Sequence, residues 1–169
     1  MPDALVLYAS VEGHTARIAQ RIAEHLRAGG HRVDVARAGG AVDASRYAAI
    51  VVGASVHYGH HPAWLAKWLK SFELGHRPSA FFSVSLSAKE RYAASFLRNA
   101  RWRPALTAVF AGALSYSQYK PLKRLVVRAL AAVAGHDTDT SRDYEYTDWQ
   151  AVERFSASVG KLIEVKARE

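Results

Sequence analysis

Residues 4–30 read ALVLYASVEGHTARIAQRIAEHLRAGG and contain three local patterns in succession. Residues 4–9 are a continuous apolar run of strand length, and residues 10–15 are a polar segment of turn-forming residues. From Thr15 onwards apolar residues recur at spacings of three and four until the glycine pair 29–30, which is typical of an amphipathic helix that ends at glycine. The stretch therefore predicts a buried strand, a short loop and a helix.

The same alternation continues along the rest of the chain. Residues 31–36 alternate, with Val33 and Val35 on one face, and predict a second strand. Apolar runs predict three more strands at residues 48–54, 80–86 and 106–114. Helical spacing predicts helices at residues 62–72, 92–100 and 120–134, and a last helix after a capping box formed by Thr147 and Gln150. Strands that alternate with helices, and that are continuously apolar, predict an α/β fold whose parallel sheet is covered on both faces.

Length and composition limit the class of protein. The chain has 169 residues, of which 50% are hydrophobic, and we expect one domain over residues 1–169. The absence of cysteine excludes disulfide scaffolds, thiolate chemistry and iron–sulfur clusters, and it favours a reducing cytosol. The start lacks the pattern of a signal peptide, and the apolar block 125–134 is about half the roughly 20 residues of a membrane span. We therefore expect a protein that is neither exported nor membrane-spanning.

The positive charge is concentrated in one part of the chain. Residues 87–128 contain nine basic residues and one acidic residue, so this segment carries the whole formal net charge of +8. A localised positive field predicts an anionic partner, which is a phosphate, a carboxylated substrate or an acidic lipid surface. The alternative is a basic face that is merely solvated.

In a doubly wound sheet, ligands bind beyond the carboxyl ends of the strands, so the loop at 10–15 is the first candidate. It combines two hydroxyl groups and a glycine at a helix N-terminus, which suits a phosphate. It lacks the lysine of a P-loop, and the chain has no G-x-G-x-x-G, so a monophosphate cofactor fits better than a nucleoside triphosphate or a nicotinamide. The alternative is that Ser10 and Thr15 only cap the helix. Glu12 is expected to point outward from a bound phosphate. The predicted contacts are Ser10, Val11, Glu12, Gly13, His14 and Thr15.

The loop at 55–62 places an aromatic ring beside a glycine, so a planar ligand could stack on Tyr58. The alternative is that Tyr58 packs on the protein itself. Three histidines, His57, His60 and His61, lie in the same loop, but no carboxylate is near them in sequence, and we predict that they line a pocket rather than hold a metal. The predicted contacts from this loop are Ser55, His57, Tyr58 and Gly59.

Small and polar residues follow the next two predicted strands. The contacts predicted there are Val84, Ser85, Leu86 and Ser87, with Gly112, Leu114 and Tyr116. Together the strand ends form a slot for a phosphate tail at one side and a planar ring at the other, which is how flavin mononucleotide (FMN) lies across such a sheet. We therefore expect FMN as the cofactor. No catalytic side chain is nominated, because a bound flavin supplies the redox chemistry.

Six segments of the sequence closely resemble one known family. They are GASVHYGH at 53–60, PSAFFSV at 78–84, WRP at 102–104, AGAL at 111–114, DTDT at 137–140 and YTDW at 146–149. The chain is similar over nearly its whole length to the bacterial quinone-dependent protoporphyrinogen dehydrogenases of the flavodoxin superfamily. The phosphate loop matches flavodoxins in general, whereas the other segments are specific to this family.

The resemblance implies a flavodoxin-like, three-layer, doubly wound sheet of five parallel strands in the order 2-1-3-4-5. It also implies FMN, and oxidation of protoporphyrinogen IX to protoporphyrin IX in haem biosynthesis with a respiratory quinone as acceptor. A further implication is peripheral contact with an anionic membrane, at the cytoplasmic face of the inner membrane. The segment 87–92 is shorter than the long loop of the best-known members, which bears on the substrate side.

A porphyrinogen carries two propionates on an apolar macrocycle, so its site needs cations beside an apolar face. The helix at 120–134 sets basic residues against an apolar side, an arrangement that can lie on an anionic bilayer. The alternative is an ordinary amphipathic helix that packs on the sheet. The predicted contacts with substrate or lipid are Arg101, Arg103, Lys120, Lys123 and Arg124.

Three other functions use the same features. A flavodoxin that only carries electrons usually meets its partners through acidic surfaces, which fits this basic chain poorly. An NAD(P)H:quinone reductase would use the same cofactor with a nicotinamide donor. Nucleic-acid binding through the basic segment is the least favoured, and we expect no nucleic-acid partner.

Overall fold

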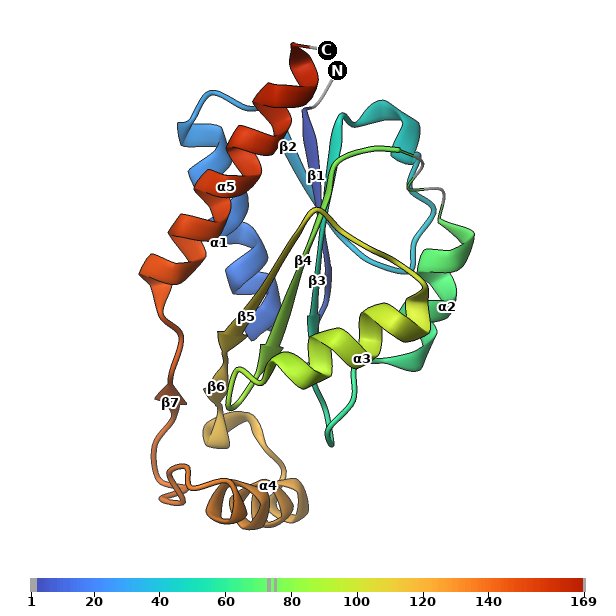
Figure 1. Ribbon diagram of the computed structural model, residues 1–169. Helices are drawn as coiled ribbons and strands as arrows, with labels where there is room; N and C mark the ends of the chain where they lie inside the picture. Colours follow the sequence, from blue (N-terminus) through green and yellow to red (C-terminus); the bar gives the residue numbers. More distant parts are fainter. Residues whose placement is uncertain (1–2, 73, 75, 169) are drawn as a thin grey trace.

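The centre of the computed structural model, which describes residues 3–72, 74 and 76–168, is a sheet of five parallel strands in the order β2-β1-β3-β4-β5 (Figure 1). This confirms the predicted topology. The strands are β1 (Ala4–Ala9), β2 (Val33–Arg37), β3 (Ala49–Ser55), β4 (Ser79–Ser85) and β5 (Leu106–Ala111). The order reverses at β1, so the loops after β1 and β3 diverge there and leave room for a ligand.

Two pairs of helices cover the two faces of the sheet (Figure 1). Helices α1 (His14–Ala28) and α5 (Trp149–Ala167) cover one face, and α2 (Ala63–Ser71) and α3 (Glu90–Ala100) cover the other. The apolar stripe of α1 is fully buried against β1, β3 and α5, as its three- and four-residue spacing predicts. A short 3-10 turn, η1 (Ala44–Arg46), precedes β3.

Residues 112–148 leave the sheet and return to it, and we call them the excursion. The excursion contains β6 (Ala113–Leu114), η2 (Tyr116–Gln118), α4 (Pro121–Val133) and β7 (Tyr144–Glu145), and β6 pairs antiparallel with β7. Its small core consists of Leu114, Tyr116, Tyr119 and Ala131. Figure 1 shows it beyond the carboxyl ends of the parallel strands. The long insertion of this chain therefore lies after β5, whereas the segment after β4 is short.

The single strand predicted at 106–114 is wrong, because the chain leaves the parallel sheet at Gly112. The Gly112 amide still donates to the Ser85 carbonyl at 3.0 Å, but its own carbonyl accepts from Tyr146 N at 2.9 Å. A side chain at position 112 would lie 3.2 Å from Val84 Cγ1, so the close approach of the two strands favours glycine. Strand pairing thus passes from β4 to β7 at this point.

The capping box predicted before α5 is also wrong. The N-cap is Asp148, whose carboxylate accepts from Ala151 N at 3.1 Å. Thr147 instead donates from Oγ1 to the Ala111 carbonyl at 2.7 Å and contacts His14 Nε2 at 2.6 Å. The threonine therefore ties the end of the excursion to the sheet. The other predicted boundaries differ from the observed ones by two residues or fewer.

Helix α4 exposes the side that its sequence marks as apolar. Leu122, Leu125, Val126, Leu130 and Val133 are all exposed, and Ala131 is the buried residue of this helix. The alternative of an amphipathic helix that packs on the sheet is therefore wrong. In the described part of the chain, no helix has both the length and the hydropathy that a membrane crossing requires.

Candidate functional site

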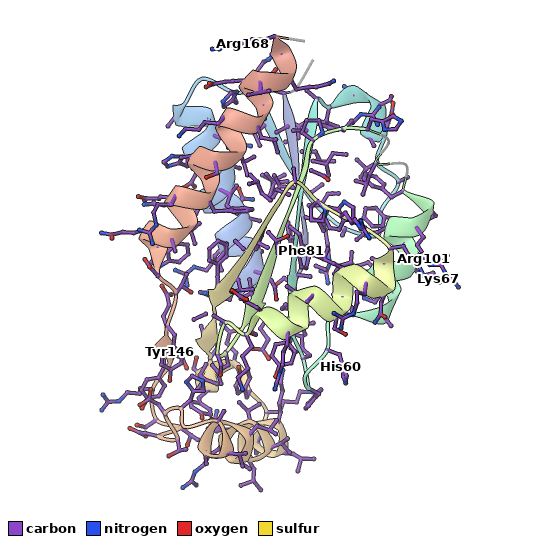
Figure 2. All side chains as sticks on the ribbon, in the orientation of Figure 1. His60, Lys67, Phe81, Arg101, Tyr146 and Arg168 are labelled. Carbon is purple, nitrogen blue, oxygen red and sulfur yellow. The ribbon has the colours of Figure 1, made fainter. Side chains whose placement is uncertain are left out.

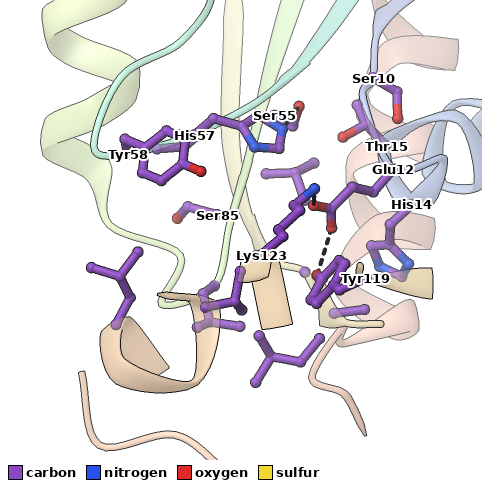
Figure 3. A pocket seen from close by; sticks show the side chains of 18 residues that line it. Ser10, Glu12, His14, Thr15, Ser55, His57, Tyr58, Ser85, Tyr119 and Lys123 are labelled. Atoms are coloured by element: carbon purple, nitrogen blue, oxygen red, sulfur yellow. Dashed lines mark hydrogen bonds and ion pairs between the residues drawn. The ribbon is translucent and has the colours of Figure 1, made fainter. Parts of the chain in front are cut away.

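A cavity of about 150 Å³ opens at the carboxyl edge of the sheet, between the β1–α1 loop, the loop after β3 and the excursion (Figure 3). The structure thus brings together the segments that the sequence selected. The predicted residues that line it are Ser10, Glu12, His14, Thr15, Ser55, His57, Tyr58, Val84, Ser85, Leu86, Gly112, Leu114 and Lys123. The lining residues that were not predicted are Val56, Ala113, Tyr119, Val127 and Leu130.

Residues 10–15, the phosphate loop, present backbone N–H groups at the start of α1. Gly13 is the N-cap with φ +91°, a conformation that favours glycine, and its amide donates to Ser10 Oγ at 2.9 Å. The first intrahelical bond runs from Arg17 N to the Gly13 carbonyl, so the amides of residues 14–16 have no acceptor within the helix. The first turn of α1 contains no acidic side chain. This helix end is suited to an anion.

Glu12 turns away from these amides and contacts the excursion (Figure 3). Its carboxylate accepts from Lys123 Nζ at 2.7 Å and from Tyr119 Oη at 2.7 Å. Burial, followed by the hydrogen bond to Glu12, raises the pKa of Tyr119, so the phenol is the donor. The negative charge of Glu12 is therefore balanced by Lys123 and directed away from the helix end.

The loop after β3 closes into a tight turn at residues 57–60, which we call the ring turn. His57 N donates to the His60 carbonyl at 2.8 Å, and His60 N donates to the His57 carbonyl at 3.1 Å. Tyr58 has φ 50° and Gly59 has φ 83°, the left-handed pair of a type I′ turn. Tyr58 is 72% exposed at the edge of the cavity, so its side chain is not packed into the protein.

Two histidines in the wall are neutral near pH 7. Burial lowers the pKa of His57, which also bonds Ser55 Oγ through Nε2 at 3.1 Å. Burial likewise lowers the pKa of His14, which contacts Thr147. A bound phosphate therefore meets dipoles and hydroxyl groups at this wall rather than imidazolium charge.

Comparison with known proteins agrees with this geometry. Residues 5–141 match the sequence family described as Flavodoxin domain. The chain is 35% identical to the protoporphyrinogen IX dehydrogenase [quinone] of Leishmania major, over 95% of this chain and 76% of that protein. It is 34% identical to the protein of the same name from Escherichia coli strain K12, over 94% of each. This chain belongs to the flavodoxin-type protoporphyrinogen IX dehydrogenase family.

Solved structures of flavodoxins share the fold of this chain. A flavodoxin from the domain Archaea superimposes with a TM-score of 0.59 at 18% identity, over 96% of this chain and 99% of that one. At 18% sequence identity this similarity shows a shared fold and nothing more.

Five nominated cofactor contacts do not line the cavity of this dehydrogenase-family member: Val11, Gly13, Gly59, Ser87 and Tyr116. Gly13 and Gly59 adopt positive φ angles that allow their loops to turn, and the Val11 side chain is exposed. Ser87 Oγ bonds His136 Nε2 at 2.8 Å, which joins the β4–α3 loop to the excursion. Tyr116 is fully buried in the excursion, where its hydroxyl donates to the Asp137 carbonyl at 2.8 Å, so its side chain packs within the excursion and does not line the cavity.

The nominated basic residues separate into two regions. Lys123 lines the cavity, Lys120 is the exposed N-cap of α4, and Arg124 donates to the carbonyls of Tyr116 and Tyr119 at 3.1 and 3.2 Å. Arg101 and Arg103 line a different hollow beside Trp102, and Figure 2 shows Arg101 on the side of α2 and α3, apart from α4. Arg101 and Arg103 therefore lie apart from the cavity that Lys123 lines, and their contact with substrate or lipid stays a prediction.

Apart from Val56, the lining residues that the sequence analysis missed come from the excursion, and two of them, Val127 and Leu130, lie on the same side of α4 as the predicted Lys123. Lys123, Val127 and Leu130 follow one another at spacings of four and three, so one stripe of α4 faces the cavity. This spacing was available in the sequence. It did not reveal that the stripe faces a ligand site, because that depends on how Glu12 and Thr147 tie the excursion to the sheet.

Proposed function

We propose that this protein binds FMN and oxidises protoporphyrinogen IX to protoporphyrin IX, with a quinone as electron acceptor, in haem biosynthesis. One observation carries the proposal. A single cavity is lined both by the N-terminus of α1, which has no acidic side chain in its first turn, and by the exposed Tyr58 of the ring turn. The cavity lies at the point where the strand order of the sheet reverses, in a chain of this family. Relatives that carry the protoporphyrinogen IX dehydrogenase name support the substrate and the acceptor.

The donor set fits FMN. The amides of residues 14–16 with the hydroxyls of Ser10 and Thr15 would hold the phosphate, and Tyr58 with the backbone of the ring turn would hold the ring. When bound, FMN supplies the two-electron redox chemistry. The protein contributes binding and orientation, and its neutral His57 and His14 add no positive charge that would compete with the phosphate loop.

The excursion supplies the features that a porphyrinogen requires. Val127 and Leu130 give the cavity an apolar wall, and Lys123 adds a cation beside it. Lys120 lies exposed one turn before Lys123. Lys120 and Lys123 are therefore the proposed partners of the propionates, in place of Arg101 and Arg103.

We further propose peripheral contact between α4 and the anionic cytoplasmic face of the inner membrane. The exposed apolar side chains of α4 adjoin the cavity and are flanked by Lys120 and the exposed Arg128. Each basic residue near an anionic surface contributes roughly 1 kcal/mol of binding free energy. Quinones dissolve in the same bilayer, so the acceptor would reach the cavity from the side on which α4 lies.

The first experiment is the absorption spectrum of the purified protein, followed by anaerobic turnover of protoporphyrinogen with a quinone, read by porphyrin fluorescence. The proposal predicts a flavin spectrum and quinone-dependent porphyrin formation. A flavin that a reductase reduces, without any porphyrin, would identify an electron carrier. Rapid NADH oxidation by quinone would identify a quinone reductase. A colourless protein that added FMN does not change would contradict the proposal as a whole.

The membrane contact is tested with vesicles of phosphatidylcholine, with and without phosphatidylglycerol. We expect sedimentation with the anionic vesicles, and its loss in the double variant Leu122→Ser, Leu125→Ser. Val165→Ser is the matched control, because Val165 is similarly exposed but lies on α5. Equal binding of wild type and double variant would contradict the contact through α4.

A further inference from the structure

Strand β4 carries two buried serines that each bond the nitrogen of an aromatic heterocycle. At the start of the strand, Trp102 Nε1 donates to Ser79 Oγ at 3.1 Å. Four residues later, Ser83 Oγ lies 2.9 Å from His61 Nε2. The first contact lies at the amino-terminal end of β4, away from the cavity. The second involves His61, the residue directly after the ring turn.

The second contact fixes which nitrogen of His61 carries the hydrogen. His61 Nδ1 lies 3.1 Å from the Ser55 carbonyl, which can only accept, so Nδ1 is the donor. In the neutral imidazole Nε2 is then the acceptor, and the Ser83 hydroxyl donates to it. The imidazole therefore links the last residue of β3 to the neighbouring strand through two directed hydrogen bonds.

His61 is well buried, and its ring is held from both sides. It is 8% exposed, and its ring centroid lies 5.6 Å from that of Phe81 and 5.1 Å from that of Phe96, with edge-on geometry. Burial keeps the ring neutral by lowering the pKa of His61 to about 4. His61 is not among the residues that line the cavity, so it can influence the cavity only through its neighbours.

The ring turn needs such support because its backbone is strained. Tyr58, a residue with a Cβ atom, has φ 50°, and a left-handed conformation costs about 1–2 kcal/mol for such residues. Such conformations persist where the surroundings hold them in place. The outgoing leg is held by Val56 N, which donates to the Val84 carbonyl at 2.8 Å. On the returning leg, the side chain directly after the turn is His61.

We propose that His61 is a positioning residue, whose bonds to Ser55 and Ser83 fix the returning leg of the ring turn in the geometry that receives the flavin ring. The inference rests on the proposed binding of FMN. It goes beyond that function because it assigns a role to a side chain outside the cavity, and because it makes Ser83 part of the support.

The test compares FMN affinities, measured by flavin fluorescence quenching, in Ser83→Ala, His61→Phe and the control Ser79→Ala. Ser83→Ala removes the donor to Nε2, and His61→Phe keeps an aromatic ring but removes both bonds. We expect the dissociation constant to rise roughly tenfold in each, as for the loss of a buried hydrogen bond. The double variant should be no weaker than His61→Phe, because the two bonds act as one link.

Two further variants separate positioning from general stability. Ser79→Ala leaves the buried Trp102 N–H without its acceptor on the same strand, so it should lower thermal stability without changing FMN affinity. His61→Asn retains a donor near the Ser55 carbonyl, so it should recover part of the affinity lost in His61→Phe. The circular dichroism of the bound flavin should shift in His61→Phe and keep its wild-type form in Ser79→Ala.

The outcomes are distinct. Wild type that binds FMN, with Ser83→Ala and His61→Phe binding equally well, overturns the positioning role and leaves the proposed function intact. Ser79→Ala that weakens binding as much as Ser83→Ala also overturns it, since the effect would then be one of stability. Wild type that binds no FMN overturns both. If His61→Phe does not fold, Ser83→Ala and His61→Asn decide the question.

Discussion

Helices α1 and α4 have the same kind of apolar spacing and opposite surroundings. The apolar side chains of α1 are buried against the sheet and α5, whereas most of those of α4 are exposed. Figure 1 shows α1 against the sheet and α4 beyond its carboxyl edge. Helical spacing predicts which residues share one face of a helix, but it does not predict what that face packs against. The apolar face of α1 stabilises the fold, and the apolar face of α4 is exposed to solvent.

The two regions are also held by different forces. The parallel sheet with α1, α2, α3 and α5, which we call the body, is held by its apolar core. The excursion is tied to the body by polar contacts such as Glu12 with Lys123, Arg17 with Glu145, and Ser87 with His136. Exposed ion pairs contribute about 0–1 kcal/mol each. The excursion should therefore open at a lower free energy than the body.

The largest expected effect separates the two helices directly. Ile22→Ala in α1 removes a fully buried side chain and should lower the free energy of unfolding by about 2–5 kcal/mol. Leu125→Ala in α4 removes a side chain that is 62% exposed, and it should change this free energy by less than about 0.5 kcal/mol. Urea unfolding measures both. A large cost for Leu125→Ala would show that a partner surface covers α4 in solution.

Acid should lower the free energy of unfolding by protonating His61 in the unfolded chain. Its pKa is lowered from 6.5 to about 4 in the fold, so the unfolded chain binds the proton more readily. The free energy of unfolding is therefore unaffected by His61 above pH 6.5, and it decreases as the pH falls from 6.5 to about 4. At ~1.4 kcal/mol per pKa unit, the decrease amounts to about 3 kcal/mol.

The measurement is urea unfolding at pH 7 and pH 4 for wild type and His61→Phe. His14 and His57 also have lowered pKa values and act in the same direction, so the difference between the two proteins isolates His61. A pH dependence that is identical in both proteins would contradict the buried neutral imidazole.

The sequence was sufficient for the body because its signals are local. Apolar runs predicted the strands, helical spacing and the glycine pair 29–30 predicted the helices, and the order 2-1-3-4-5 followed from the family resemblance. The candidate site was largely predictable for the same reason, since residues after parallel strands gather at one edge. That residues 1–169 form one domain stays a prediction.

The excursion was not predictable, because its structure depends on contacts between distant residues. Gly112 ends one strand pairing and starts another with a segment more than thirty positions later, and no local pattern marks that change. Thr147 resembles a helix cap in sequence but serves as a tie to β5. Tyr119 and Val127 reach the cavity because Glu12 draws the excursion toward the phosphate loop.

A smaller effect is expected from Glu12→Gln, which removes the ion pair with Lys123. The pair is partly buried, so the excursion should open more easily by about 1 kcal/mol, which is roughly a fivefold faster amide hydrogen exchange in α4. Glu153→Gln is the matched control, because Glu153 pairs with Arg21 at 2.7 Å between α5 and α1. Glu153→Gln should leave amide hydrogen exchange in α4 unchanged. Equal exchange in α4 for wild type and Glu12→Gln would show that Glu12 is not a tie.

The smallest effect concerns Arg17, which joins α1 to the returning end of the excursion. Its guanidinium lies 2.8 Å from Glu145 and 5.7 Å from the centre of the Trp149 ring, and Trp149 Nε1 donates to the same glutamate. Because three groups share these contacts, Arg17→Gln should lower the free energy of unfolding by about 0.5 kcal/mol, and less at high salt. Arg154→Gln, which breaks a more exposed pair with Asp148, should have almost no effect. If both variants behave alike in thermal unfolding at low salt, the contacts around Trp149 add nothing to an ordinary surface pair, and the excursion is held chiefly at Glu12 and Thr147.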